Sequence, residues 1–105
     1  MNDYCVVLVT ASNRQEAETI SHVLVEKRVA ACVNLIPLIR SEYWWEGKIE
    51  QAEESLLVIK TLYAKLDEVT ETVKAHHSYT VPEVIALPIV KGNPDYLQWI
   101  TDSLT

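Results

Sequence analysis

The stretch Tyr43-Trp44-Trp45-Glu46-Gly47-Lys48-Ile49 decides the fold, because it joins two long strand-like runs through one short turn. Glu46-Gly47-Lys48 supplies the turn, and strand-forming residues flank it on both sides. The run Val29–Ile39 continues through Trp45 and is interrupted at Pro37, which indicates a bulge or an edge strand. The run Ile49–Thr61 follows the turn. The sequence therefore predicts a long hairpin.

The remaining elements follow from periodicity on either side of this hairpin. A buried strand at Tyr4–Val9 precedes the loop Thr10–Ser12, and Asn13 then begins a helix with capping-box spacing to Glu16. After the hairpin we expect, in order, the helix Leu62–His77, the loop Ser78–Pro82, the strand Val84–Val90 and, following Pro94, the short helix Asp95–Ser103.

The order of these elements, βαββαβ with a terminal helix, predicts one ferredoxin-like α+β domain over residues 1–105. Its sheet is antiparallel and two helices cover one face. The first strand lies between the third and fourth, and the second strand lies at an edge. Cys5 and Cys32 are then on non-adjacent strands, so we expect two reduced, structural thiols.

Several strands are apolar on both faces, which does not suit a sheet with one solvated face. The clearest cases are Val6–Val9, Leu56–Ile59 and Val84–Leu87. Two helices cover only one side of a sheet, so we expect a second copy of the chain to bury the other side.

Composition excludes several classes of partner. The net charge of −6 disfavours nucleic acid and anionic membranes, and no run is long enough to span a bilayer. The start Met1-Asn2-Asp3-Tyr4 lacks the features of a signal peptide, so a cytoplasmic location is expected.

Across most of its length the chain resembles the CutA family of divalent-cation-tolerance proteins. The matching segments are Ala30–Asn34, Tyr43–Ile49, Ile59–Thr61, His77–Ile89, Gly92-Asn93, Tyr96-Leu97 and Trp99. The resemblance implies a ferredoxin-like domain in a tight homotrimer similar to the PII signalling proteins. It also implies a link to copper and other divalent metals.

The same resemblance implies candidate metal ligands. Some bacterial members are proposed to bind copper through one cysteine and two consecutive histidines, and these positions correspond to Val9, His76 and His77. Valine removes the soft ligand that favours Cu(I), so weak binding of Cu(II) or another divalent cation is expected. Neighbouring helical residues point about 100° apart and chelate one ion poorly. Alternatively, both rings bond to the helix end and the loop backbone.

A second candidate site is a cleft between subunits. Its candidate residues are Tyr43, Trp44, Trp45, Lys60, Tyr79 and Glu83. The aromatic residues line either a ligand cleft or, as aromatics commonly do, a subunit interface. Lys60, Tyr79 and Glu83 either face a cleft or form a polar network that holds the loop.

No catalytic arrangement is apparent, so we expect a protein that is not an enzyme. The Glu50–Lys60 strand lacks the aromatic residues of an RNA-recognition module, and the loop after the first strand lacks a C-x-x-C copper site. Two hypotheses remain. The first is a trimeric metal-responsive protein that binds copper or another divalent cation. The second is a PII-like signalling or structural trimer that binds a small anionic metabolite between subunits.

Overall fold

The computed structural model describes residues 3–104, and residues 1, 2 and 105 of the expected 1–105 domain lie outside the described part. The order of elements is the expected βαββαβ pattern with a terminal helix. The elements are β1 (Tyr4–Ala11), α1 (Arg14–Glu26), β2 (Cys32–Trp45), β3 (Lys48–Leu62), a 3-10 helix (Tyr63–Lys65), α2 (Leu66–His76), β4 (Val84–Pro88) and α3 (Pro94–Ser103).

The four strands form one antiparallel sheet in the order β2-β3-β1-β4, as predicted. The first strand is central: Val7 pairs with Ile59 of β3 and with Ala86 of β4. β2 lies at an edge and contacts β3 only within the sheet. Cys5 and Cys32 are therefore two strands apart, and both thiols are free.

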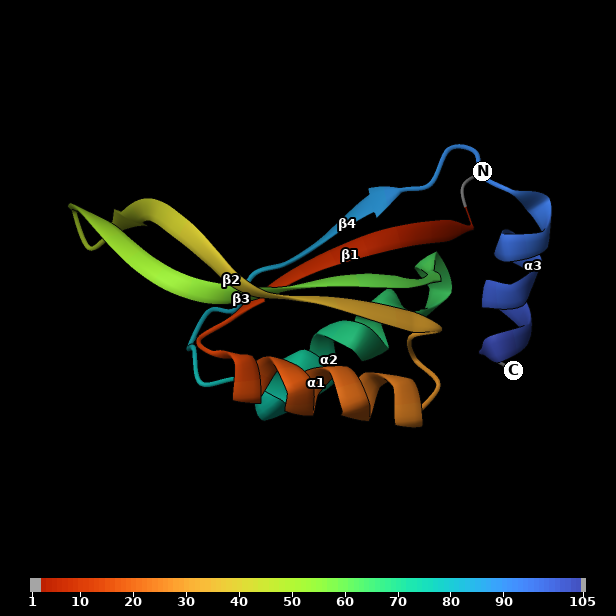
Figure 1. The fold of residues 1–105 in the computed structure, drawn as a ribbon, viewed down its shortest axis with the longest axis horizontal. Helices are drawn as coiled ribbons and strands as arrows, with labels where there is room; N and C mark the ends of the chain where they lie inside the picture. The colour runs from red at the N-terminus through yellow and green to blue at the C-terminus, as the bar shows by residue number, and fades with distance from the viewer. Residues whose placement is uncertain (1–2, 105) are drawn as a thin grey trace.

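Helices α1 and α2 cover one face of the sheet, and α3 stands at one end of it (Figure 1). The core between the sheet and the two helices consists of apolar side chains that are almost completely buried. They include Val7, Val9, Ala17, Ile20, Leu24, Leu57, Ile59, Val69 and Val73. The polar contacts that hold α3 include Tyr4 Oη at 2.7 Å from Thr101 Oγ1 and the bond that Arg28 Nη1 donates to the Ser103 carbonyl at 2.8 Å.

The β2–β3 hairpin extends beyond the body of the molecule as an arm (Figure 1), within overall dimensions of 44 × 26 × 22 Å. Glu46 and Gly47 turn the chain with φ angles of 51° and 79°, the pattern of a two-residue type I′ turn. The predicted irregularity at Pro37 is a bulge, where the pairing shifts between Ile36 and Ile39. Ser55 Oγ donates a hydrogen bond to the Pro37 carbonyl at 2.7 Å, and this bond stabilises the bulge.

The face of the sheet opposite the helices is apolar and largely open, as the two-sided strand pattern indicates. Ile85 and Leu87 of β4 are each 51% exposed on this face, and Ile36 of β2 is also exposed. No helix among the described residues is long and apolar enough to cross a membrane.

Several predicted boundaries were wrong by a few residues. Thr10 and Ala11 belong to β1 rather than to a loop, because both pair with β3. The helix expected from Leu62 begins at Leu66, because residues 63–65 form a 3-10 turn first. β2 begins at Cys32 rather than at Val29, and β4 ends at Pro88, which lacks the amide hydrogen needed to continue the ladder.

Candidate functional site

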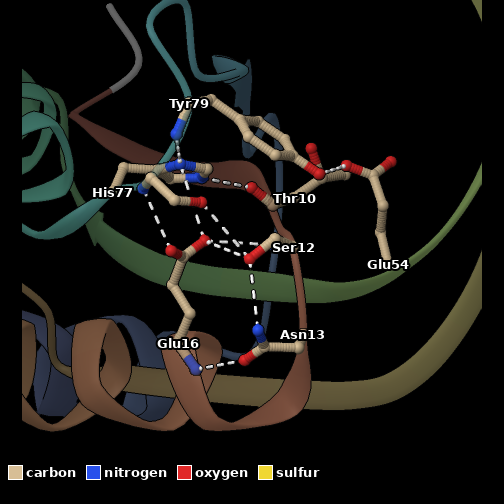
Figure 2. Close-up of polar contacts among 8 residues, drawn as sticks. Thr10, Ser12, Asn13, Glu16, Glu54, His77 and Tyr79 are labelled. Atoms are coloured by element: carbon tan, nitrogen blue, oxygen red, sulfur yellow. Dashed lines mark hydrogen bonds and ion pairs between the residues drawn. The ribbon is translucent and has the colours of Figure 1, made fainter.

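The ends of β1 and α2 and the start of α1 meet in a polar cluster (Figure 2). Asn13 caps α1, since its Oδ1 accepts from the Glu16 amide at 2.8 Å. The Glu16 carboxylate returns to Ser12 rather than to the cap residue, accepting from the Ser12 amide at 3.0 Å and from its hydroxyl at 3.1 Å. Its other oxygen accepts from the Ser78 amide at 3.0 Å. Glu16 thereby joins the start of α1 to the loop after α2.

The side chain of His77 is fully buried within this cluster. Its Nε2 lies 2.7 Å from the Thr10 carbonyl, and its Nδ1 lies 3.0 Å from the Tyr79 amide nitrogen. A carbonyl only accepts and an amide N–H only donates, so Nε2 carries the proton and Nδ1 is the acceptor. Both ring nitrogens of His77 are therefore hydrogen-bonded to backbone groups. This is the alternative in which the histidine rings bond to the loop backbone rather than to a metal ion. Metal binding by His77 requires one of these bonds to break.

The pKa of Glu16 reflects opposing effects of this environment. Burial acts to raise the pKa, but the hydrogen bonds from Ser12 and Ser78 act in the opposite direction, and the net pKa is lowered. The Glu16 side chain is 13% exposed, and its Oε2 lies 3.6 Å from His77 Nδ1. Glu16 is thus held as a carboxylate at the junction.

His76 is placed differently from its neighbour. Its side chain is exposed, and its Nδ1 bonds to the Thr72 carbonyl at 3.0 Å. Because the carbonyl accepts, Nδ1 carries a proton, and in the neutral ring the lone pair is then on Nε2, for which residues 3–104 provide no partner. Val9, at the position of the proposed cysteine ligand, is 0% exposed in the core. The described residues contain no cluster of three or more His, Cys, Asp or Glu side chains that could hold a metal ion.

A pocket of about 660 Å³ lies between the base of the hairpin arm and the loop after α2. The lining residues are Thr10, Ser41, Glu42, Tyr43, Trp45, Glu54, Ser78, Tyr79, Thr80, Val81 and Glu83. Four residues of the predicted cleft, namely Tyr43, Trp45, Tyr79 and Glu83, are thus brought together.

Two other residues of the predicted cleft do not line this pocket. Trp44 is 73% exposed and pairs with Ile49 near the tip of the arm. The Lys60 ammonium donates to Asn34 Oδ1 on the sheet and forms no ion pair with Glu83 in the described part of the chain.

Glu54 is the principal pocket residue that sequence reasoning missed. It is 6% exposed, and its Oε2 accepts from the Tyr79 hydroxyl at 2.6 Å (Figure 2). Burial first, and then the bond to Glu54 and its charge, raise the pKa of Tyr79 well above its ordinary range. The phenol therefore remains a donor. In the sequence, the only signal is that Glu54 directly precedes the buried run from Ser55, and a charged strand end is normally solvated.

The lining of the pocket is acidic and aromatic. Glu42, Glu54 and Glu83 supply carboxylates, and no lysine, arginine or histidine within residues 3–104 contributes to the lining. Arg40 approaches from outside, with Nη1 3.4 Å from Glu42 Oε1. This arrangement favours a positively charged group over an anion.

These features define a ferredoxin-like α+β protein with an extended hairpin arm and an acidic pocket at the base of the arm. The chain belongs to the CutA1 divalent ion tolerance protein family, whose model matches residues 5–103. The family resemblance and the fold expected from the sequence are thereby confirmed.

Individual relatives match the sequence of this chain over nearly its whole length. "Divalent-cation tolerance protein CutA" of Thermus thermophilus is 46% identical over 98 residues, which cover 93% of this chain and 95% of the relative. "Protein CutA 1, chloroplastic" of Oryza sativa is 50% identical over 93% of this chain but only 55% of its own length. This chain spans about half the length of that rice relative and of its Arabidopsis thaliana counterpart, of which 54% is covered.

Solved structures match equally well. The crystal structure of CutA1 from Oryza sativa has a TM-score of 0.95 and 47% identity, covering 99% of this chain and 95% of the other. The structure described as the periplasmic divalent cation tolerance protein CutA of Archaeoglobus fulgidus has a TM-score of 0.94 and 44% identity, covering 97% and 99%.

Proposed function

We propose that this chain serves in divalent-cation tolerance as a homotrimer that binds a divalent cation weakly, with Cu(II) as the candidate ion and His76 as the first ligand. The observation that carries this proposal is the state of the His76 ring. Metal-bound histidines typically donate one N–H to a carbonyl or carboxylate and ligate through the other nitrogen. His76 is an exposed residue that already donates from Nδ1 to the Thr72 carbonyl, so Nε2 of the neutral ring is the nitrogen available to a metal ion. The proposal assigns binding and no catalysis.

The chemistry of the available ligands favours Cu(II) over Cu(I). Cys5 is 1% exposed, and burial raises the pKa of its thiol, so it is unsuited to act as a thiolate ligand. Val9 offers no ligand atom. Imidazole and carboxylate groups suit Cu(II), and one protein imidazole with water ligands gives weak binding. His77 contributes only if it gives up its bond to Thr10 or to Tyr79.

Support for the trimer comes from unburied apolar surface. Ile85 and Leu87 on the open face of the sheet and Trp44 on the arm are each at least half exposed. Apolar surface shared between a sheet face and a projecting arm is typical of subunit interfaces. The cytoplasmic location stays a prediction, since relatives are described as chloroplastic and one structure as periplasmic.

Calorimetric titration with Cu(II) tests the metal assignment. We expect saturable binding by the parent protein and a loss of affinity of at least about tenfold in His76→Ala, comparable to losing one metal ligand or its support. The matched control is His22→Ala, which removes another exposed histidine and leaves the affinity unchanged. Binding weakens on acidification, because only neutral imidazole ligates.

Two results would contradict the assignment. One is unchanged affinity in His76→Ala together with lost binding in Cys32→Ser. The other is binding by the parent that does not exceed that of a protein without exposed histidines, which would make the metal role indirect.

The alternative, a PII-like signalling trimer that binds a small anionic metabolite, has less support. Its best candidate location is the pocket, where the described part of the chain contributes three carboxylates to the lining and no basic side chain. The one basic residue of the predicted cleft, Lys60, lies outside it and bonds to Asn34.

A further inference from the structure

We propose that the pocket at the base of the hairpin arm binds a small organic cation, with an ammonium or guanidinium group carried on an apolar body. This inference goes beyond the divalent-cation function and concerns different residues. Neither His76 nor His77 lines the pocket.

The first step of the argument is the environment of Glu54. The side chain is 94% buried, since its exposure is 6%, and Oε2 is bonded to the Tyr79 hydroxyl. No hydrogen bond or ion pair within residues 3–104 reaches the other oxygen, Oε1, and no fully buried side-chain oxygen or nitrogen in that range lacks a partner, so Oε1 is the accessible oxygen of this carboxylate. A charged donor that reaches a nearly buried carboxylate makes a stronger hydrogen bond than a neutral donor does. Because Glu54 lines the pocket, its accessible oxygen is available to a cationic donor that enters the pocket.

The second step is the aromatic part of the lining. Tyr43, Trp45 and Tyr79 all face the same pocket, and the first two are 41% and 50% exposed. The faces of aromatic rings attract cations and also accept apolar groups. A volume of about 660 Å³ exceeds what a bare ion needs and suits a small organic molecule.

The third step excludes other ligands. A tightly bound metal ion needs several converging protein ligands, and residues 3–104 contain no group of three His, Cys, Asp or Glu side chains placed to hold one, so the pocket is not a tight metal site. An anion would meet the carboxylates of Glu54 and Glu83, which form no ion pair within the described part of the chain. Arg40 offsets only the charge of Glu42.

The same positive group has two possible sources, a free organic cation or a lysine or arginine side chain of a neighbouring copy. We commit to the free cation. The probe is phenethylammonium, and the matched anion is 3-phenylpropanoate, which has similar size and shape but the opposite charge. Titration of the assembled protein is followed by NMR through the probe's own signals, and in variants that keep Trp45 its indole signal is a second, local reporter.

We expect saturable binding of phenethylammonium, a shift of the Trp45 signal and no saturable binding of the anion. Glu54→Gln keeps the shape and an acceptor for Tyr79, and it weakens binding by about tenfold through loss of a charge-assisted bond. The matched control is Glu53→Gln, an exposed neighbour outside the lining, which leaves the affinity within about twofold of the parent. Should Glu54→Gln fail to fold, Trp45→Ala at an exposed position gives the second test.

The proposal is overturned if the parent does not bind the probe saturably, if the anion binds equally well, or if both Glu54→Gln and Trp45→Ala bind like the parent. A change in assembled mass caused by Glu54→Gln, without probe binding by the parent, would assign the pocket to a neighbouring copy and also overturn it. His76→Ala should leave probe binding unchanged, so failure of this proposal and failure of the metal proposal are distinguishable.

Discussion

The Nε2 atom of His77 lies 2.7 Å from the carbonyl oxygen of Thr10, so a residue 67 positions later in the chain is bonded directly to the central strand. The other nitrogen of the same ring accepts the Tyr79 amide. A single buried side chain therefore fixes both the end of α2 and the beginning of the loop that lines the pocket. Its main role in this structure is to position that loop.

Replacing His77 tests this positioning role. His77→Ala leaves the Thr10 carbonyl and the Tyr79 amide without their partner, and we expect a loss of about 3 kcal/mol in the free energy of unfolding. Urea denaturation at fixed protein concentration measures the loss. The matched control is His22→Ala, whose side chain is 76% exposed, with an expected change within about 0.5 kcal/mol. Equal effects of the two changes would contradict the role.

The lowered pKa of Glu16 predicts a specific dependence of stability on pH. The unfolded chain holds this proton more tightly than the folded chain, so the carboxylate stabilises the fold fully above its ordinary pKa of 4.5. That contribution is lost as the pH falls from there through the lower folded-state pKa. Denaturation curves from neutral pH into this acid range should show a shallower decline for Glu16→Gln than for the parent. Identical slopes would refute the assignment.

The turn of the hairpin predicts an asymmetry between the two glycines. Gly47→Ala should cost about 1 kcal/mol in the free energy of unfolding, because φ is +79°. No atom lies within 4 Å of the added Cβ, so the cost comes from backbone conformation alone. Gly92→Ala, which has ordinary van der Waals contact with Leu97 and no positive φ, should cost less. Thermal or chemical denaturation of both variants makes the comparison.

Assembly gives the fourth prediction. Light scattering of the dilute protein should give about three times the chain mass of 11.9 kDa. Trp44→Ala should weaken assembly by a few kcal/mol, on the order of 2, if the exposed ring is an interface anchor. Val25→Ala on the outer surface of α1 is the control and should leave the mass unchanged. A parent mass near 11.9 kDa would refute the trimer.

Local sequence signals predicted most of the fold. Asn13 marked the start of α1 and Pro37 marked the bulge, because each acts through its own backbone geometry. The order of elements was enough to place β1 in the centre of the sheet. Boundaries such as Leu62 failed because a 3-10 turn and an α-helix share the same early periodicity.

The site was less accessible to sequence reasoning. Tyr79 and Glu83 were identified as site candidates, but the pairing of Tyr79 with Glu54 depends on the path of an irregular loop. No periodicity encodes that path. His77 was considered as a ligand, whereas its burial and its two backbone partners arise only from the packing of α2 against β1.

The central position of β1 has a consequence for how the chain folds during synthesis. β1 precedes both of its partner segments in the chain, so Ser55–Leu62 and Val84–Pro88 emerge much later than β1 does. The apolar run Val6–Val9 therefore has no strand partner during this part of synthesis. The β2–β3 hairpin can form in the meantime, because a short turn joins its two strands. We expect pulse-labelling hydrogen exchange to protect hairpin amides before those of β1. The strand that holds the finished sheet together is, for a nascent chain, the segment most exposed to misassociation.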